Sequence, residues 1–109
     1  MKLETRGGRR HHKDLQLCRQ VFDALSLAFA EIDDPSIDHL AIASVTPAPT
    51  GARLLVTLVP TRTDLDTDAA LASVHGVMNE LREEVAAEIT RKRAPELVFR
   101  IGYLDEQQQ

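Results

Sequence analysis

The residues that could do chemistry in this chain are its four histidines, its single cysteine and its 17 acidic residues. His39 and His75 could serve as acid and base if the fold placed an Asp or Glu beside them. A chain with this many acids offers such pairs by chance. The sequence contains no Gly-x-Ser-x-Gly, His-Glu-x-x-His, Cys-x-x-Cys or phosphate-loop motif. We therefore expect that the protein is not an enzyme and uses no cofactor.

Two clusters could bind a metal, and neither carries a full ligand set. His11 and His12 are adjacent, but no group of Cys, Asp or Glu accompanies them. Asp64, Asp66 and Asp68 alternate as in a calcium loop, yet the required glycine and the distal glutamate are missing. Carboxylates at such positions stabilise the first turn of a helix. The sequence thus predicts a helix start near Asp66 and no metal site.

Cys18 belongs to an apolar row in which residues recur in steps of three and four, with Leu15, Phe22, Leu25, Phe29 and Ile32. That spacing predicts a helix over 13–32, which Asp33-Asp34-Pro35 should end. Cys18 then acts as a small buried hydrophobe and not as a nucleophile. Because one cysteine cannot form an internal disulfide, and no apolar run approaches the roughly 20 residues of a membrane span, we expect a cytoplasmic protein.

Two strands are predicted at 38–46 and 52–59, where small, aliphatic and β-branched residues dominate. Pro47, Pro49 and Gly51 lie between them and favour a turn. The two strands should therefore form an antiparallel hairpin.

A second helical pattern continues from Asp66 to about Arg93, and its apolar side contains Val74, Met78, Leu81, Val85 and Ile89. Gly76 and Asn79 are poor helix formers inside this run, which predicts a break within 76–79. Pro95 ends the pattern, and after it Leu97, Phe99, Ile101 and Tyr103 alternate as in a strand. The prediction is an α+β fold with the order αββααβ, in which a three-stranded mixed sheet packs against helices. We expect one domain over 13–104, a disordered basic arm over 1–12 and a short polar tail over 105–109.

The segment LREEVAAEITRKRAPELVFRIG resembles the last helix and last strand of ribosome-binding factor A. In that family an early Arg leads to a Pro-Glu-Leu-x-Phe turn and strand, which Arg82, Pro95 and Phe99 match here. The segment DPSIDHLAIASVTPAPTGARLLVTL is similar to the family's Asp-Pro turn and first hairpin, so the resemblance covers roughly 21–103. It implies a type II KH arrangement, and a monomer that binds the immature small (30S) ribosomal subunit and its 16S rRNA. Such a factor assists late maturation and rRNA processing without catalysis, with ribosomal proteins as possible further partners.

The sequence departs from the family at the junction of its last two helices. Ordinary KH domains clamp a nucleic-acid backbone there with a Gly-x-x-Gly loop, and this family has an Ala-x-Gly kink instead. The aligned positions are Val77, Met78 and Asn79, which lack both the small residue and the glycine. Because Asn tolerates left-handed backbone geometry, we expect a kink to persist. The family's Asp after the Phe is also missing, and Arg100 and Gly102 occupy that region.

The resemblance directs attention to the cations, and the candidate RNA contacts are Arg9, Arg10, Lys13, Arg91, Lys92 and Arg93. Residues 1–13 carry a local charge of +4, which leaves −8 for the rest of a chain whose net charge is −4. An acidic body argues against indiscriminate nucleic-acid binding, so any contact must use local basic patches. The run 91–93 could instead complement the negative end of a helix dipole, and Glu88 could pair with Lys92. Arg82 should pair with a neighbouring glutamate.

A second hypothesis, from a different class, is a small α+β domain without an RNA role. It would use its sheet for homodimerisation or protein interaction, or as the scaffold of an enzyme.

Overall fold

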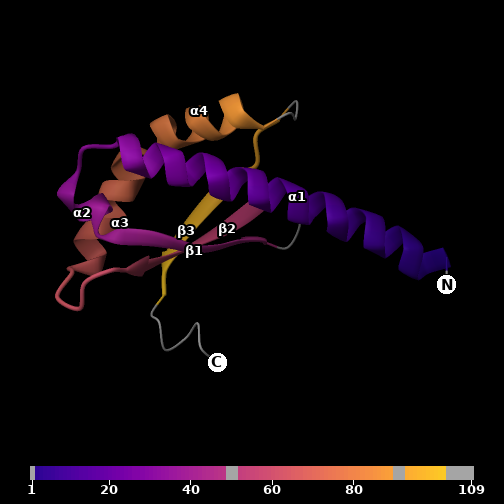
Figure 1. Ribbon diagram of the computed structural model, residues 1–109, viewed down its shortest axis with the longest axis horizontal. Helices are drawn as coiled ribbons and strands as arrows, with labels where there is room; N and C mark the ends of the chain where they lie inside the picture. Colours follow the sequence, from indigo (N-terminus) through magenta and orange to yellow (C-terminus); the bar gives the residue numbers. More distant parts are fainter. Residues whose placement is uncertain (1, 49–51, 90–92, 103–109) are drawn as a thin grey trace.

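A three-stranded sheet forms one layer of the molecule, and helices cover one of its faces (Figure 1). The structure is a computed structural model that describes residues 2–48, 52–89 and 93–102, with side chains from residue 14 onward. The strand order is β1-β2-β3. β1 (Leu40–Pro47) runs antiparallel to β2 (Arg53–Pro60), and β2 runs parallel to β3 (Glu96–Ile101). The mixed sheet and the hairpin predicted from the sequence are confirmed.

Helix α1 (Lys2–Glu31) lies along this sheet and contacts both β1 and α4. From Leu17 to Phe29 its apolar side is buried, with Val21 and Leu25 fully inaccessible. The predicted start near Lys13 is wrong, since the helical backbone begins at Lys2, where an arm without regular structure was expected. No proline precedes Pro35, and the helical backbone continues through Gly7 and Gly8 although glycine is a poor helix former.

The end of α1 is set by the sequence Asp33-Asp34-Pro35, as predicted. A single helical turn follows, α2 (Pro35–Asp38), which is a short element that the sequence did not predict. An Asp34 carboxylate oxygen accepts a hydrogen bond from the Ser36 backbone nitrogen at 2.9 Å. Pro35 occupies the first turn, where its missing N–H costs no helical hydrogen bond.

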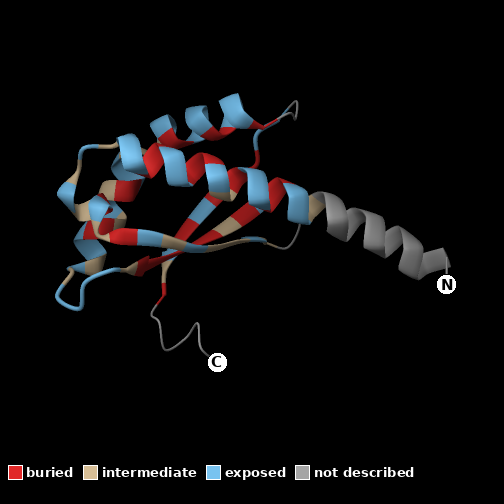
Figure 2. Ribbon diagram, in the orientation of Figure 1, coloured by how far each residue is buried: buried red, intermediate tan, exposed pale blue. Residues whose placement is uncertain are grey.

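The core lies between the helices and the covered face of the sheet. Leu54, Val56 and Leu58 alternate along β2 and are fully buried (Figure 2). The parallel register sets Leu97 beside Leu54 and Phe99 beside Val56, so β3 extends the same apolar surface. In β1 the register shifts between Ile42 and Ser44, a bulge that breaks the strict alternation of that edge strand.

The second helical pattern divides in two, α3 (Thr67–Gly76) and α4 (Met78–Glu88). Val77 separates them with φ −110° and ψ 18°, so the break falls inside the predicted region but uses no left-handed residue. Asn79 lies within α4. The predicted end near Arg93 is wrong: α4 ends at Glu88, and Ile89 is extended, with only 7% of its surface exposed. Burial of Ile89 in this extended conformation accompanies the end of the helix.

The cap of α3 gives a direct test of the fold. An Asp66 carboxylate oxygen accepts a hydrogen bond from the Ala69 backbone nitrogen at 3.1 Å. Replacing Asp66 with Ala should lower the free energy of unfolding by about 0.5–2 kcal/mol, because that N–H loses its acceptor. The matched control is Asp68→Ala, which removes a carboxylate from the same first turn without removing a capping bond. Urea unfolding followed by circular dichroism measures both, and equal losses would contradict the capping role.

Candidate nucleic-acid interface

Most of the cations proposed to contact RNA lie outside the residues whose side chains are described. Arg91 and Lys92 belong to the segment 90–92, which is outside the described residues. Arg9, Arg10 and Lys13 lie on the α1 backbone, and their side chains are outside that description as well. Arg93 is the one member of the set with a described side chain, and it is exposed.

Arg93 does not sit on a helix. Because α4 ends at Glu88, Arg93 follows five residues later and cannot complement the last turn of its dipole, which acts only locally. It lies three residues before Glu96, where β3 begins. Glu96 forms an ion pair with Arg53 of β2, at 3.3 Å between nitrogen and oxygen. Arg93 therefore precedes the end of the sheet at which β2 and β3 both begin.

The helices leave one face of the sheet uncovered (Figure 1). Arg100 of β3 belongs to this face, since it pairs in register with Thr57 and alternates with the buried Phe99. The register pairs Leu55 with Val98 and Thr57 with Arg100 on this face. The Arg100 Nε donates to the Thr57 Oγ1 at 3.0 Å, which fixes the guanidinium over the strand and satisfies a hydroxyl that is almost fully buried. The sequence analysis missed this arginine as a binding candidate. The sequence held one signal for it. Thr57 is a single polar residue in the apolar run of β2, and its hydroxyl needs a partner such as Arg100 on the neighbouring strand.

The junction between α3 and α4 is acidic, whereas the uncovered face of the sheet carries arginines. A groove of about 430 Å³ lies between the end of α1 and the start of α4, with Val77 and Leu81 in its lining. None of its lining residues is basic. Five of them are acidic: Glu31, Asp33, Asp34, Glu80 and Glu84. Of the predicted kink residues, Val77 and Met78 are half-buried and Asn79 is exposed. A groove of this charge repels phosphates, so it does not resemble a backbone clamp.

The ion pair predicted for Arg82 is not found among the described residues. It is exposed on α4, and no carboxylate among the described residues makes an ion pair with it. The glutamates near it on α4 are exposed as well. An exposed pair of this kind gains little, because water screens it and two long side chains must be ordered.

Neither His39 nor His75 forms a hydrogen bond or ion pair with a carboxylate among the described residues. His39 Nε2 lies 3.5 Å from an Arg62 nitrogen, and Arg62 in turn binds Asp64 at 2.7 and 3.0 Å. The hydrogen bonds from Arg62 lower the pKa of the Asp64 carboxyl. Arg62 thus lies between His39 and Asp64, and His75 is exposed at the end of α3.

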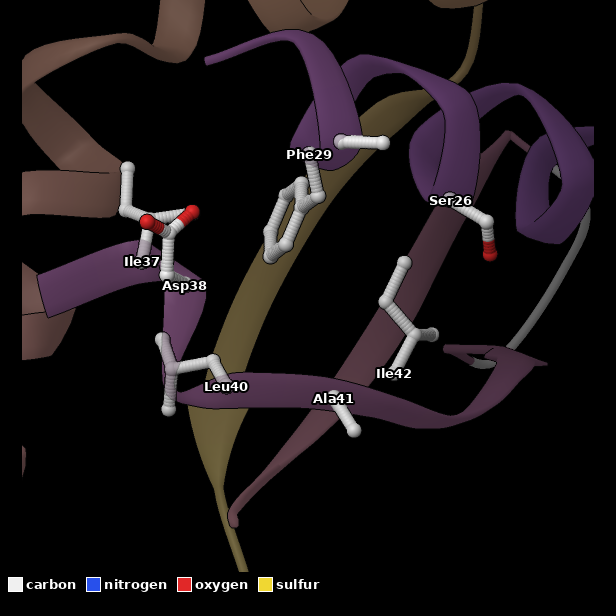
Figure 3. Close-up of a pocket in the computed structure, with 8 residues that line it drawn as sticks. Ser26, Phe29, Ile37, Asp38, Leu40, Ala41 and Ile42 are labelled. Carbon is white, nitrogen blue, oxygen red and sulfur yellow. The ribbon is translucent and has the colours of Figure 1, made fainter. Parts of the chain in front are cut away.

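A pocket of about 400 Å³ between α1 and β1 has the size of a small-molecule site but little polar chemistry (Figure 3). Phe29, Leu40 and Ile42 line its middle. Its polar side chains are Ser26 and Asp38, which Figure 3 shows at opposite ends of the pocket. A nucleophile and its base must lie within hydrogen-bond distance, which this separation does not provide.

Neither a metal site nor a membrane span is found in the described part of the chain. No group of three or more His, Cys, Asp or Glu residues there is arranged to hold a metal ion. No described helix is both long and apolar enough to cross a bilayer.

The architecture is that of an α+β protein with the type II KH order of elements, which the sequence predicted. It is similar to the crystal structure of ribosome-binding factor A from Thermus thermophilus, with a TM-score of 0.69 and 23% sequence identity. The likeness covers 81% of this chain and 94% of that one. No protein-family model matches the sequence, and a search of the curated proteins finds no match. At this level of identity the likeness establishes the fold.

Cys18 is buried against the core, and burial, followed by the charge of Asp14, raises the pKa of its thiol. Iodoacetamide should therefore alkylate Cys18 far more slowly in the folded protein than in urea, as mass spectrometry can measure.

Because the folded state holds the thiol proton more tightly than the unfolded chain, the free energy of unfolding should fall as the pH rises above the ordinary thiol pKa of about 8.5. A Cys18→Ala variant should lose this alkaline slope. A native thiol that reacts as fast as the unfolded one would show that the site opens readily.

Proposed function

We propose that this protein is a ribosome biogenesis factor that binds the immature small (30S) ribosomal subunit and its 16S rRNA. It assists late maturation and rRNA processing by binding alone. The observation that supports this most is the structural likeness to ribosome-binding factor A across 94% of that chain. The residues that carry the sequence resemblance lie on α4 (Arg82), before β3 (Pro95) and within β3 (Phe99), in keeping with the proposal.

The charges of the described residues favour one side of the molecule for the RNA. The described residues of the uncovered face of the sheet include Arg53 and Arg100 and a single acid, Glu96, and Arg93 lies three residues before β3 in the chain. The groove at the helix junction carries five carboxylates. The described side chains of this face include no aromatic residue on which a base could stack. Contact should therefore rest on phosphates and on the shape of the rRNA.

Binding without catalysis can still promote maturation. A ligand shifts an equilibrium between two conformations only by its difference in affinity for them. A factor that binds one rRNA arrangement more tightly raises the population of that arrangement and is released when the mature contacts form. This mechanism requires no nucleophile or acid–base pair.

The first test is sedimentation of the tagged protein in a lysate of its native cells. Comigration with free small subunits, and not with translating ribosomes, is the expected result. The RNA recovered with the protein should be 16S rRNA or its precursor. A protein that stays at the top of the gradient at low salt would refute the proposal.

The second test concerns the cationic run. Changing Arg91, Lys92 and Arg93 together to Ala should weaken binding to small subunits and reduce the salt dependence of log K by about 1 for each phosphate that the variant no longer neutralises. The matched single variants are Arg93→Ala and Arg62→Ala, because Arg62 follows β2 at the opposite end of the sheet. Cosedimentation across a salt series should separate the two. If the triple variant and Arg93→Ala both behave as the unchanged protein does, the run is not part of the interface.

A further inference from the structure

Arg53 and Arg100 lie on the same uncovered face of the sheet but have different partners. Arg53 forms an ion pair with Glu96 at 3.3 Å between nitrogen and oxygen, so a neighbouring carboxylate offsets its charge. Arg100 donates from Nε to the neutral Thr57 Oγ1 at 3.0 Å, and it forms no ion pair with a described residue. Of these two arginines, Arg100 is therefore the one whose charge is left for a ligand.

The described residues beside Arg100 on this face are uncharged. Thr57 lies opposite it in the strand register, and the preceding pair on the same face is Leu55 with Val98. Glu96 is four positions earlier in β3, which is about 13 Å along a strand. That distance exceeds the Debye length of about 8 Å at physiological salt. Within the described part of the sheet, the surface around Arg100 is therefore locally positive.

Thr57 is the only polar side chain that is buried among the described residues, with 1% of its surface exposed. Packing does not require its hydroxyl, because a valine of similar shape would fill the position and need no polar partner. The surrounding core restricts the rotamer of a buried side chain. The Thr57 hydroxyl is therefore a fixed acceptor at the foot of an exposed arginine.

The hydrogen bond to Thr57 uses only the Nε side of the Arg100 guanidinium. Because this group is planar and rigid, fixing Nε also restricts the direction of its terminal nitrogens. Their N–H groups form the fork that binds two oxygens of a phosphate. An arginine without such a bond must lose its rotamer freedom when the ligand binds. Thr57 removes part of that entropy loss before the ligand arrives.

We propose that Arg100 binds a phosphate group of the 16S rRNA backbone and that Thr57 is the positioning residue that orients it. The inference rests on the function proposed above, because an arginine fork binds carboxylates as well as phosphates. Every nucleotide carries the same phosphate, so this contact reads no sequence. It sets the position of the rRNA on the sheet.

The first measurement is the affinity of the full chain for protein-free 16S rRNA and for small subunits over a salt series. Arg100→Ala should weaken both by about tenfold and lower the salt dependence of log K by about 1, because one phosphate is no longer neutralised. The matched control on the same face is Arg53→Ala. Its effect should be smaller, because Glu96 already offsets the charge of Arg53.

The second measurement isolates the role of Thr57. Thr57→Val should weaken binding by about threefold and leave the salt dependence unchanged, because the charge of Arg100 is retained. Thr57→Ser keeps the hydroxyl and should bind as the unchanged protein does. In the Arg100→Ala background, Thr57→Val should have no further effect, since the hydroxyl acts only through the arginine. Circular dichroism and urea unfolding check that each variant is folded.

Three results would overturn the inference while ribosome binding stands. An Arg100→Ala variant that keeps its affinity and its salt dependence would remove the phosphate contact. An equal loss from Thr57→Val with and without Arg100 would show a packing effect in place of positioning. A loss seen with small subunits but not with protein-free rRNA would show that Arg100 contacts a protein carboxylate. If the unchanged protein binds neither, the proposed function fails and this inference fails with it.

Discussion

The apolar layer between the helices and one face of the sheet is the constraint on which the rest of this structure depends. Leu54, Val56 and Leu58 are fully buried, and each such side chain contributes about 1.5–3 kcal/mol relative to exposure. Because β2 is the central strand, its register positions both β1 and β3. The same alternation that turns these three residues inward turns Arg53 and Thr57 toward the uncovered face, where Thr57 holds Arg100.

This one-sided layer also separates the charges. Among the described side chains, the exposed surface of α1 and α4 carries more acids than bases: Asp23, Glu83 and Glu88 are exposed there, and so are Arg19 and Arg82. The uncovered face of the sheet carries two arginines. A molecule with a net negative charge can therefore still offer a phosphate-compatible surface, because what matters at contact distance is the local charge. The overall charge affects the rate of approach and makes binding sensitive to salt.

The junction of α3 and α4 has the two separate helices of a KH domain but not the residues of a backbone clamp. A break at Val77 keeps two separate helices at the point where KH domains present a backbone clamp. Here the groove beside it is surrounded by carboxylates, among them Glu80 and Glu84, and it lacks the glycines of a clamp. We therefore place the proposed RNA contact on the sheet side of the domain.

The sequence by itself determined the elements and their order. Proline, capping aspartates and the switch from helical to strand period act within a few residues, and so α1 ended before Pro35, α3 began after Asp66 and β3 followed Pro95. Local signals did not determine where α4 ends, because the burial of Ile89 decided it, nor that α1 begins at Lys2.

Which residues share a surface could not be predicted from the sequence either. Arg100 meets Thr57 across 43 positions, and the acids of α1 and α4 meet in one groove, because packing of the helices on the sheet brings distant segments together. Tertiary structure decided these features, since charge and hydrogen bonding act through space and not along the chain.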